Sequence, residues 1–184
     1  MGRGAGDIAL NTAIASGATA VVVPEFPLDS NASIIEKIKN SKRIGKRNFI
    51  VIVSEGLGHK YGPSLTEQIE RETGVETRFA CLAHVVRGGS PTLRDRVLAS
   101  TMGEFAVKEL LEGRSDIVVC ERENKIVSTN ISYALVLDRM YKDKLKDGDL
   151  DAFTAEEIAE MKAFCEEKKI AMRALYNTVN TLGL

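Results

Sequence analysis

The sequence lacks any long hydrophobic run, since its longest, residues 18–23, is only strand-length and a membrane-spanning helix needs about 20 apolar residues. An excess of charge of one sign is also missing, because 25 basic and 26 acidic residues leave a formal net charge of −1. Such a chain has no field that would attract nucleic acid or anionic lipid. We therefore expect neither as a partner, and any bound anion must be held by a local group of residues.

Cysteine and histidine are scarce. Cys81, Cys120 and Cys165 are widely spaced and the chain has two histidines, so no zinc-binding spacing can be built and no metal site is expected. An odd number of cysteines argues against a disulfide framework, and Cys81 and Cys120 lie in apolar runs where a buried thiol behaves as a small hydrophobe. The N-terminal residues are glycine-rich and polar, unlike a signal peptide, so a cytoplasmic location is expected.

What is present suits a globular chain. The 184 residues, 44% hydrophobic and 28% charged, exclude collagen-like and disordered classes and allow one sizeable domain or two small lobes. Short apolar runs alternate with helical patterns, which predicts an α/β fold with a mostly parallel sheet flanked by helices in three layers, followed by a C-terminal helical extension. Strands are expected at 20–23, 49–53 and 77–82, helices at 8–15, 33–42, 64–73, 91–112, 132–146 and 154–181, and a hairpin at 116–128.

Three loops follow the expected strands. Ligands of open α/β sheets bind outside the carboxyl ends of the strands, so Pro24-Glu25, residues 54–58 and residues 83–91 are the candidate site loops. The boundary between a ligand-binding α/β region and the helical extension packed on it is expected near residue 130, giving regions 1–130 and 131–184.

The third loop carries the strongest signal. Arg87 precedes Gly88-Gly89, and a helix expected to be capped by Ser90 and opened by Pro91 comes next. A guanidinium, accessible backbone amides and a helix N-terminus together form an anion site. His84 adds a donor. The alternative is a plain glycine turn in which Arg87 pairs with Asp95.

Three other residues could serve the same ligand. Arg3 lies in the glycine-rich segment before the first helix, which could also be an ordinary disordered terminus. Arg78 begins the third expected strand and could equally form a surface salt bridge. Glu55 follows a buried strand and could accept hydrogen bonds from sugar hydroxyls or be a solvated loop carboxylate.

These segments resemble the 6-phosphofructokinase family. The block His84-Val85-Val86-Arg87-Gly88-Gly89-Ser90-Pro91 is specific to that family, and the likeness extends over about residues 1–128. The other matching segments occur in the family's order and are Met1-Gly2-Arg3, Gly6-Asp7, Pro24-Glu25, Ser54-Glu55-Gly56, Glu76-Thr77-Arg78 and residues 95–100.

The resemblance implies roles for individual residues. Arg3 would line the sugar site and also lie near the transferred phosphoryl group, and Glu55 would bind sugar hydroxyls. His84 and Arg87 would grip the 6-phosphate, and Arg78 would reach the phosphate of a neighbouring subunit. The whole implied set for fructose 6-phosphate is Met1, Gly2, Arg3, Glu55, Arg78, His84, Val85, Val86 and Arg87.

The resemblance also implies an activity. It is ATP-dependent 6-phosphofructokinase: transfer of a phosphoryl group from ATP, with Mg²⁺, to the 1-hydroxyl of fructose 6-phosphate in glycolysis, by a homo-oligomer that is a dimer or tetramer. The family's glycine-rich nucleotide site and its Thr-Ile-Asp-Asn-Asp segment, with the catalytic base and a magnesium ligand, are not in this sequence. We therefore expect a C-terminal, substrate-binding fragment that is inactive alone, with its ATP and Mg²⁺ sites in an N-terminal half. The alternatives are part of a pyrophosphate-dependent enzyme or a non-catalytic phosphosugar-binding module.

Overall fold

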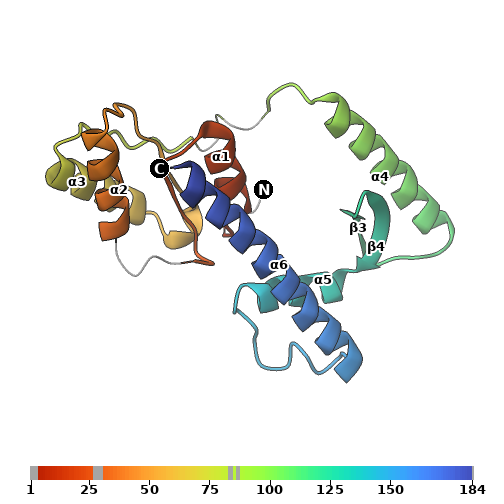
Figure 1. The fold of residues 1–184 in the computed structure, drawn as a ribbon. Coiled ribbons are helices and arrows are strands. Elements are labelled where there is room, and N and C mark those ends of the chain that lie inside the picture. The colour runs from red at the N-terminus through yellow and green to blue at the C-terminus, as the bar shows by residue number, and fades with distance from the viewer. Residues whose placement is uncertain (1–3, 27–30, 83–84, 86–87, 184) are drawn as a thin grey trace. The chain divides into compact units, whose positions relative to one another are not determined.

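The computed structural model describes residues 4–26, 31–82, 85 and 88–183, which form two compact units. The first unit contains residues 1–81 and 166–184, and the second contains residues 82–165. Figure 1 labels the helices and strands. Their bounds are α1 (Asp7–Ser16), β1 (Ala20–Val22), α2 (Ala32–Arg43), β2 (Val51–Val53), the 3-10 helix η1 (Glu55–Leu57), α3 (Tyr61–Thr73), α4 (Leu93–Leu111), β3 (Ile117–Arg122), β4 (Lys125–Asn130), α5 (Ile131–Tyr141) and α6 (Ala155–Leu182).

The first unit is built on a short parallel sheet. β1 and β2 pair with Val21 opposite Ile52, and because parallel neighbours need a crossover, α2 lies between them in the chain. α2 and α3 pack together (Figure 1) and close the core over one face of the sheet. That core is formed by the buried residues Ala20, Val22, Ile34, Ile35, Ile38, Leu65 and Ile69.

Two further helices complete the first unit. α1 contacts both strands, and its buried Leu10 and Ala13 lie outside the α2–α3 core, so α1 covers the other face of the sheet. α1 ends at Gly17, whose φ of 62° is a left-handed conformation that glycine adopts without steric cost. The predicted parallel sheet between helices is therefore confirmed.

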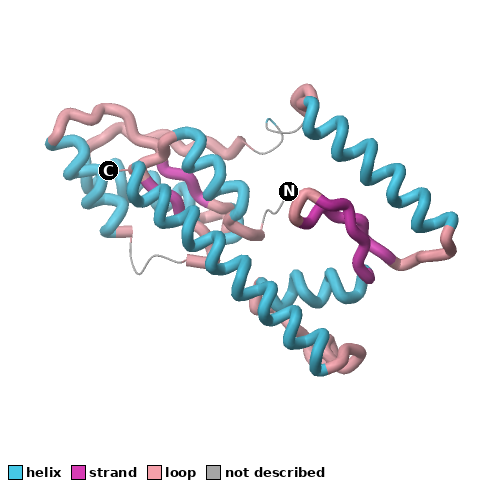
Figure 2. The backbone as a smooth tube through the Cα atoms, turned by 45° about the vertical axis from the view of Figure 1, so that its right-hand side comes forward, coloured by secondary structure: helices cyan, strands magenta, loops and turns pink. Residues whose placement is uncertain are grey.

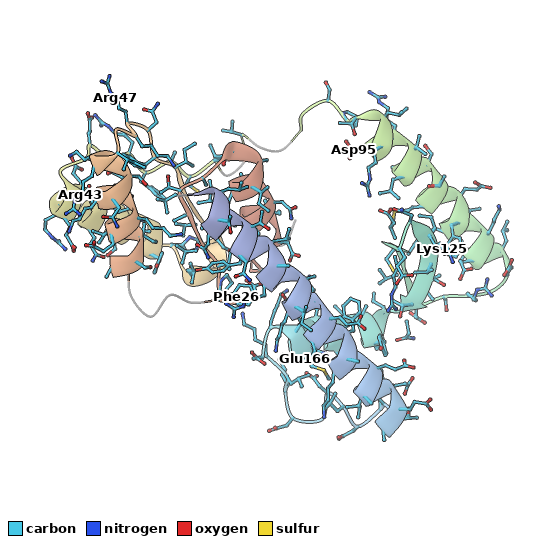
Figure 3. The ribbon with its side chains drawn as sticks, in the orientation of Figure 1. Phe26, Arg43, Arg47, Asp95, Lys125 and Glu166 are labelled. Carbon is cyan, nitrogen blue, oxygen red and sulfur yellow. The ribbon has the colours of Figure 1, made fainter. Side chains whose placement is uncertain are left out.

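The last turns of α6 also belong to this unit. Phe26 lies beside α6 (Figure 3), with its ring centroid 5.5 Å from that of Tyr176. The guanidinium of Arg173 sits 3.7 Å from the Phe26 centroid, a cation–π contact. Lys37 on α2 donates to Oδ1 of Asn180 at 2.7 Å, and burial lowers the pKa of Lys37. The predicted C-terminal helical extension is confirmed.

The second unit contains an antiparallel hairpin. β3 and β4 pair from Ile117 opposite Asn130 to Arg122 opposite Lys125 (Figure 2). The two turn residues, Glu123 and Asn124, have φ of 52° and 60°. Two successive residues with positive φ make the turn type whose twist matches a tight hairpin. The predicted hairpin is confirmed, with each strand slightly longer than expected.

Polar contacts join this hairpin to α4. Glu109 on α4 is 5% exposed, and Nε and Nη2 of Arg114 donate to its two carboxylate oxygens at 2.7 and 2.5 Å. The hydroxyl of Ser128 on β4 donates to the same carboxylate at 2.9 Å. These hydrogen bonds, first that of Arg114 and then that of Ser128, lower the pKa of Glu109. Glu109 therefore links helix, loop and hairpin as a carboxylate.

One predicted strand is wrong. Residues 77–82 form no strand in the structure, because no described segment pairs with them, and an extended run becomes a strand only when its amides and carbonyls find a partner. Phe79 instead packs on Gly62, where an added Cβ would lie 2.5 Å from the ring. Cys81 is consequently exposed rather than buried and Cys120 is only half-buried, whereas Cys165 is buried, and the structure shows no disulfide among the three.

Two predicted helix starts are also wrong. α3 begins at Tyr61 rather than at the expected Ser64 cap, because Pro63 is accommodated in the first turn, where no backbone N–H is needed. α4 begins after Thr92 rather than at Ser90-Pro91. By contrast, Thr154 caps α6 as predicted, since its hydroxyl accepts from the Glu157 amide at 3.2 Å.

Candidate functional site

The described part of the site lies at the carboxyl ends of β1 and β2. Three segments meet there: residues 4–6 before α1, the turn Pro24-Glu25 after β1, and residues 54–56 after β2. Parallel strands present their carboxyl ends at the same sheet edge, which is where open α/β sheets bind ligands. Two of these loops were candidates from the sequence, and the structure joins both to the N-terminal segment.

Glu25 attaches the turn after β1 to the N-terminal segment. Its Oε1 accepts the amide hydrogen of Gly6 at 2.9 Å. Its Oε2 is buried without a hydrogen-bond partner among the described residues. Gly6 is packed so closely that an added Cβ would lie 2.6 Å from both Glu25 Oε2 and Val23. A side chain at position 6 would therefore push the two segments apart.

Ser54 attaches the turn after β2 to the same segment. Its hydroxyl donates to the carbonyl of Ala5 at 3.0 Å and accepts from the Gly56 amide at 3.3 Å. Its own amide donates to Val22 at 2.9 Å, which continues the β1–β2 pairing by one residue. Ser54 thus caps η1, the single turn that contains Glu55.

Gly56 completes the contact. A Cβ at this position would lie 3.0 Å from the Gly4 carbonyl and 2.9 Å from Pro24, so the backbones of residues 4 and 56 touch. Glu55 is exposed at this point. The structure therefore places Glu55 beside the segment that directly follows the predicted ligands Met1, Gly2 and Arg3. Those three residues lie outside the described residues.

The remaining predicted site residues are less well connected. Arg78 is largely exposed and forms an ion pair with Glu76 at 2.5 Å, the surface salt bridge that the sequence left open. Val85 is 86% exposed and belongs to the second unit. His84, Val86 and Arg87 lie outside the described residues.

The N-terminus of α4 has a different cap from the one predicted. The Thr92 amide and hydroxyl each donate to Oδ2 of Asp95 at 2.8 Å, and the Asp95 amide donates back to the hydroxyl at 3.3 Å. These hydrogen bonds, the backbone one first, lower the pKa of Asp95. The signal missed in the sequence was Thr92-Leu93-Arg94-Asp95, a capping box with Asp in place of Glu. Asp95 at the start of α4 is labelled in Figure 3.

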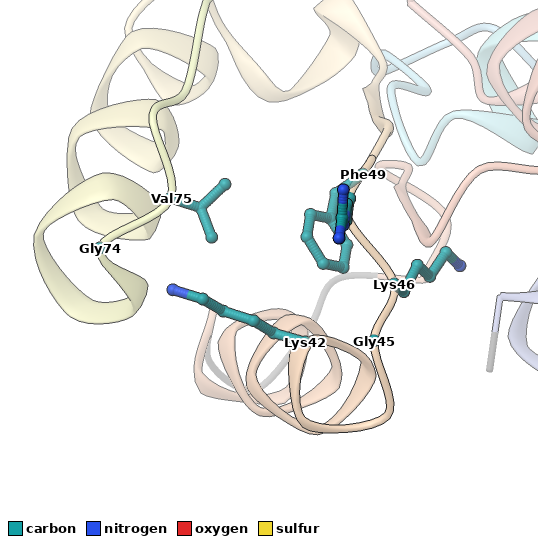
Figure 4. A pocket seen from close by; sticks show the side chains of 7 residues that line it. Lys42, Gly45, Lys46, Phe49, Gly74 and Val75 are labelled. Carbon is teal, nitrogen blue, oxygen red and sulfur yellow. The ribbon is translucent and has the colours of Figure 1, made fainter.

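A pocket in the first unit lies away from these residues. Its volume is about 380 Å³, and Figure 4 shows the side chains that line it. They come from the end of α2, the loop between α2 and β2, and the residues after α3. The pocket therefore lies near the start of β2, whereas Glu55 follows the end of β2. Lys42 points across it and donates to the Thr73 carbonyl at 3.2 Å. Its lining residues are Lys42, Gly45, Lys46, Arg47, Phe49, Gly74 and Val75. None of the predicted site residues that the structure describes is among them.

The described residues show neither a metal-binding cluster nor a membrane-spanning helix. No cluster of three or more His, Cys, Asp or Glu side chains could hold a metal ion there. None of the described helices is both long and apolar enough to cross a membrane.

Comparison with known proteins gives consistent matches. The family model described as Phosphofructokinase matches residues 1–110. The chain is 44% identical over 145 residues to ATP-dependent 6-phosphofructokinase 1 of Clostridium perfringens, covering 79% of this chain and 44% of that protein. It is 47% identical over 135 residues to the ATP-dependent 6-phosphofructokinase of Brevibacillus brevis, covering 73% and 41%. The chain therefore spans less than half the length of these curated relatives.

Solved structures show the same fold. Phosphofructokinase of Saccharomyces cerevisiae superposes with a TM-score of 0.68 at 28% identity, over 89% of this chain and 24% of that one. Phosphofructokinase of Pichia pastoris in the T-state gives 0.67 at 25% identity, over 86% and 20%. The family model covers more than half of the sequence. Pro24-Glu25 and Ser54-Glu55-Gly56, at the sheet edge, are among the motifs that carried the resemblance. The chain belongs to the phosphofructokinase family.

Proposed function

We propose that this chain supplies the sugar-phosphate-binding part of an ATP-dependent 6-phosphofructokinase. In that reaction the 1-hydroxyl of fructose 6-phosphate attacks the terminal phosphorus of ATP, the bond to the bridging oxygen breaks, ADP leaves, and the hydroxyl proton passes to a base. The observation that carries the proposal is the junction at the sheet edge, where Ser54 bonds to Ala5 and Gly56 touches Gly4. It brings Glu55 next to the segment following Met1-Gly2-Arg3.

Different residues bind different parts of the substrate in this proposal. Glu55 accepts hydrogen bonds from the sugar hydroxyls, and Arg3 lies between the sugar and the transferred phosphoryl group. His84 and Arg87 bind the 6-phosphate, for which a guanidinium offers paired, charge-assisted hydrogen bonds. Met1, Gly2, Val85 and Val86 line the sugar.

Arg78 has a separate place in the proposal. Its guanidinium is largely exposed and, among the described residues, pairs with the likewise exposed Glu76, so it is able to reach another molecule. We assign it to the 6-phosphate bound by a neighbouring subunit, which makes the competent state a homo-oligomer. Sedimentation with and without fructose 6-phosphate tests this, and a monomer that binds at full affinity would contradict it.

ATP and Mg²⁺ belong to the reaction as a whole. The described residues hold no cluster of three or more His, Cys, Asp or Glu side chains fit for a metal ion. The sequence contains neither a Thr-Ile-Asp-Asn-Asp segment nor a Gly-x-x-x-x-Gly-Lys loop. Because phosphoryl transfer depends on a positioned base and charge clamp, we expect this chain alone to show no turnover with ATP or pyrophosphate. Turnover above a no-enzyme blank would contradict that.

The decisive experiment is a calorimetric titration of the chain with fructose 6-phosphate at physiological salt. We expect saturable binding that Arg87→Ala weakens by about 10- to 150-fold, or roughly 1.5–3 kcal/mol for a hydrogen bond to a charged group. Arg43→Ala is the matched control, because Arg43 is an exposed arginine at the end of α2 and should leave the affinity unchanged. Equal affinities for wild type and Arg87→Ala would overturn the assignment of that loop.

A further inference from the structure

Ser54 is the residue at which the two described parts of the proposed sugar site meet. It is 5% exposed, and neither the sequence motifs nor the family likeness gave it a role of its own. Its hydroxyl is used twice: it donates to Ala5 at 3.0 Å on the N-terminal segment and accepts from Gly56 at 3.3 Å on the turn that contains Glu55. A single oxygen atom, the Ser54 Oγ, therefore makes both hydrogen bonds that join the two segments.

The surroundings leave little freedom for this link to be replaced. The Ser54 amide is fixed to the carbonyl of Val22 on β1, so the side chain cannot move away with its backbone. Gly56 touches the Gly4 carbonyl and Pro24 closely enough that even a Cβ would not fit. Tight contact of this kind transmits a shift in one segment to the other.

Removing the hydroxyl would leave two backbone groups without this partner. The carbonyl of Ala5, a buried residue, would lose a donor, and an unsatisfied buried polar group is costly. The amide of Gly56, an exposed residue, would lose its side-chain acceptor. A small movement of η1 away from residues 4–6 would let water reach the Ala5 carbonyl and so reduce this cost. Such a movement displaces Glu55, the residue that follows Ser54 in the chain.

We propose that Ser54 is a positioning residue for sugar-phosphate binding, which holds the Glu55 turn against residues 4–6 and so sets where the Glu55 carboxylate lies. Ser54 does not touch the ligand and acts through Glu55. This inference rests on the proposed function, because it concerns the same site. It predicts that the effect of losing the hydroxyl depends on the presence of the Glu55 carboxylate.

A double-mutant cycle on the full chain tests this, with fructose 6-phosphate as the titrant. Ser54→Ala should weaken binding by about 5- to 10-fold, the scale of one to two neutral hydrogen bonds. Ser54→Thr keeps the hydroxyl and should stay within about 2-fold of wild type, a difference near the limit of additivity in such cycles. In a Glu55→Ala background, Ser54→Ala should change the affinity by less than about 2-fold, because the group it positions is gone.

Folding is controlled separately. Thermal unfolding by circular dichroism reports on each variant, and Ser54→Cys provides a second test if Ser54→Ala does not fold. Cysteine has nearly the same shape but is a weak donor and acceptor, so the same loss of affinity is expected.

The outcomes are distinct. Wild type without any binding overturns the proposed function and this inference with it. Wild-type binding that Ser54→Ala or Ser54→Cys leaves unchanged overturns the inference alone. An equal loss on removing the Ser54 hydroxyl with and without Glu55 also overturns it, because Ser54 would then act independently of that carboxylate.

Discussion

The two units of this chain are stabilised in different ways. Among the described residues, the buried apolar side chains of the second unit are Val136, Tyr141, Met161 and Cys165, and all the others belong to the first unit. The first unit encloses a layered core around a parallel sheet. In the second, α4 has one buried residue, the charged Glu109, and its exposed residues include Leu93, Val97, Val107, Leu110 and Leu111.

This difference shows which interactions stabilise each unit. In the first, apolar burial is the main stabilising term, and it is roughly proportional to the area removed from water. In the second, hydrogen-bonded charges and helix caps fix the geometry, and such contacts respond to pH and salt. Substitutions of matched type in the two units should therefore have unequal effects.

The largest effect is expected from the core of the first unit. Ile35 is 1% exposed, and Ile35→Ala should lower the free energy of unfolding by about 2–5 kcal/mol through lost burial and the cavity left behind. Urea unfolding measures the change. The matched control is Ile170→Ala on α6, where the side chain is 69% exposed and little change is expected. Similar losses for both would mean that the α2–α3 core does not dominate this unit.

The next effect concerns pH in the second unit. The hydrogen bonds from Arg114 and Ser128 hold the pKa of Glu109 below its ordinary value of 4.5 in the folded chain. A depressed pKa contributes stability that is complete above the unfolded pKa and is lost as the pH falls through the folded pKa. Hydrogen exchange of residues 109–128 should therefore accelerate as the pH decreases below about 4.5, after correction for intrinsic rates.

Glu109→Gln provides the control for that experiment. Glutamine keeps the shape of the side chain and one acceptor but cannot titrate. The variant should exchange faster at neutral pH and lose most of the acid-dependent change in this segment. A wild-type pH profile that the substitution leaves unaltered would show that another carboxyl group causes it.

A smaller effect is expected at the start of α4. Thr92→Ala removes the capping hydroxyl and should cost about 1 kcal/mol, whereas Thr92→Ser keeps it and should cost much less. Native-state hydrogen exchange of the first turns of α4 detects the change. Equal protection in the two variants would mean that Asp95 alone fixes this helix end.

The smallest effect is expected from an exposed ion pair. Lys142 lies 2.7 Å from Asp138 one helical turn earlier, and Lys142→Ala should change the free energy of unfolding by no more than about 0.5 kcal/mol. The difference from wild type should shrink further as the salt is raised to about 1 M, where the screening length falls to roughly 3 Å, close to the length of the contact itself. A loss comparable to that of Ile35→Ala would invalidate the ranking.

Local signals in the sequence predicted most of the elements correctly. Gly17 ends α1 and Thr154 caps α6, because both functions depend on residues within one helical turn. The apolar run at 20–23 and the pattern at 33–42 predicted β1 and α2, since periodicity reflects which side faces the core. The candidate loops at Glu25 and Glu55 followed from one rule about strand ends.

Errors arose where two signals competed or where a partner was required. Residues 77–82 have strand-like composition, but a strand exists only as a pair, and pairing is a property of the whole fold. At α4, Ser90-Pro91 and Thr92 both resemble helix starts. The reciprocal hydrogen bonds between Thr92 and Asp95 make Thr92 the N-cap of α4.

For the site, the sequence by itself determined which residue types are available and that their loops follow strands. It also carried the motifs that place the chain in the phosphofructokinase family. Only the tertiary structure decided that residue 5 meets residue 54 and that Gly4 touches Gly56. Contacts between segments about 50 residues apart form through packing and buried hydrogen bonds, and neither leaves a periodic pattern in the sequence.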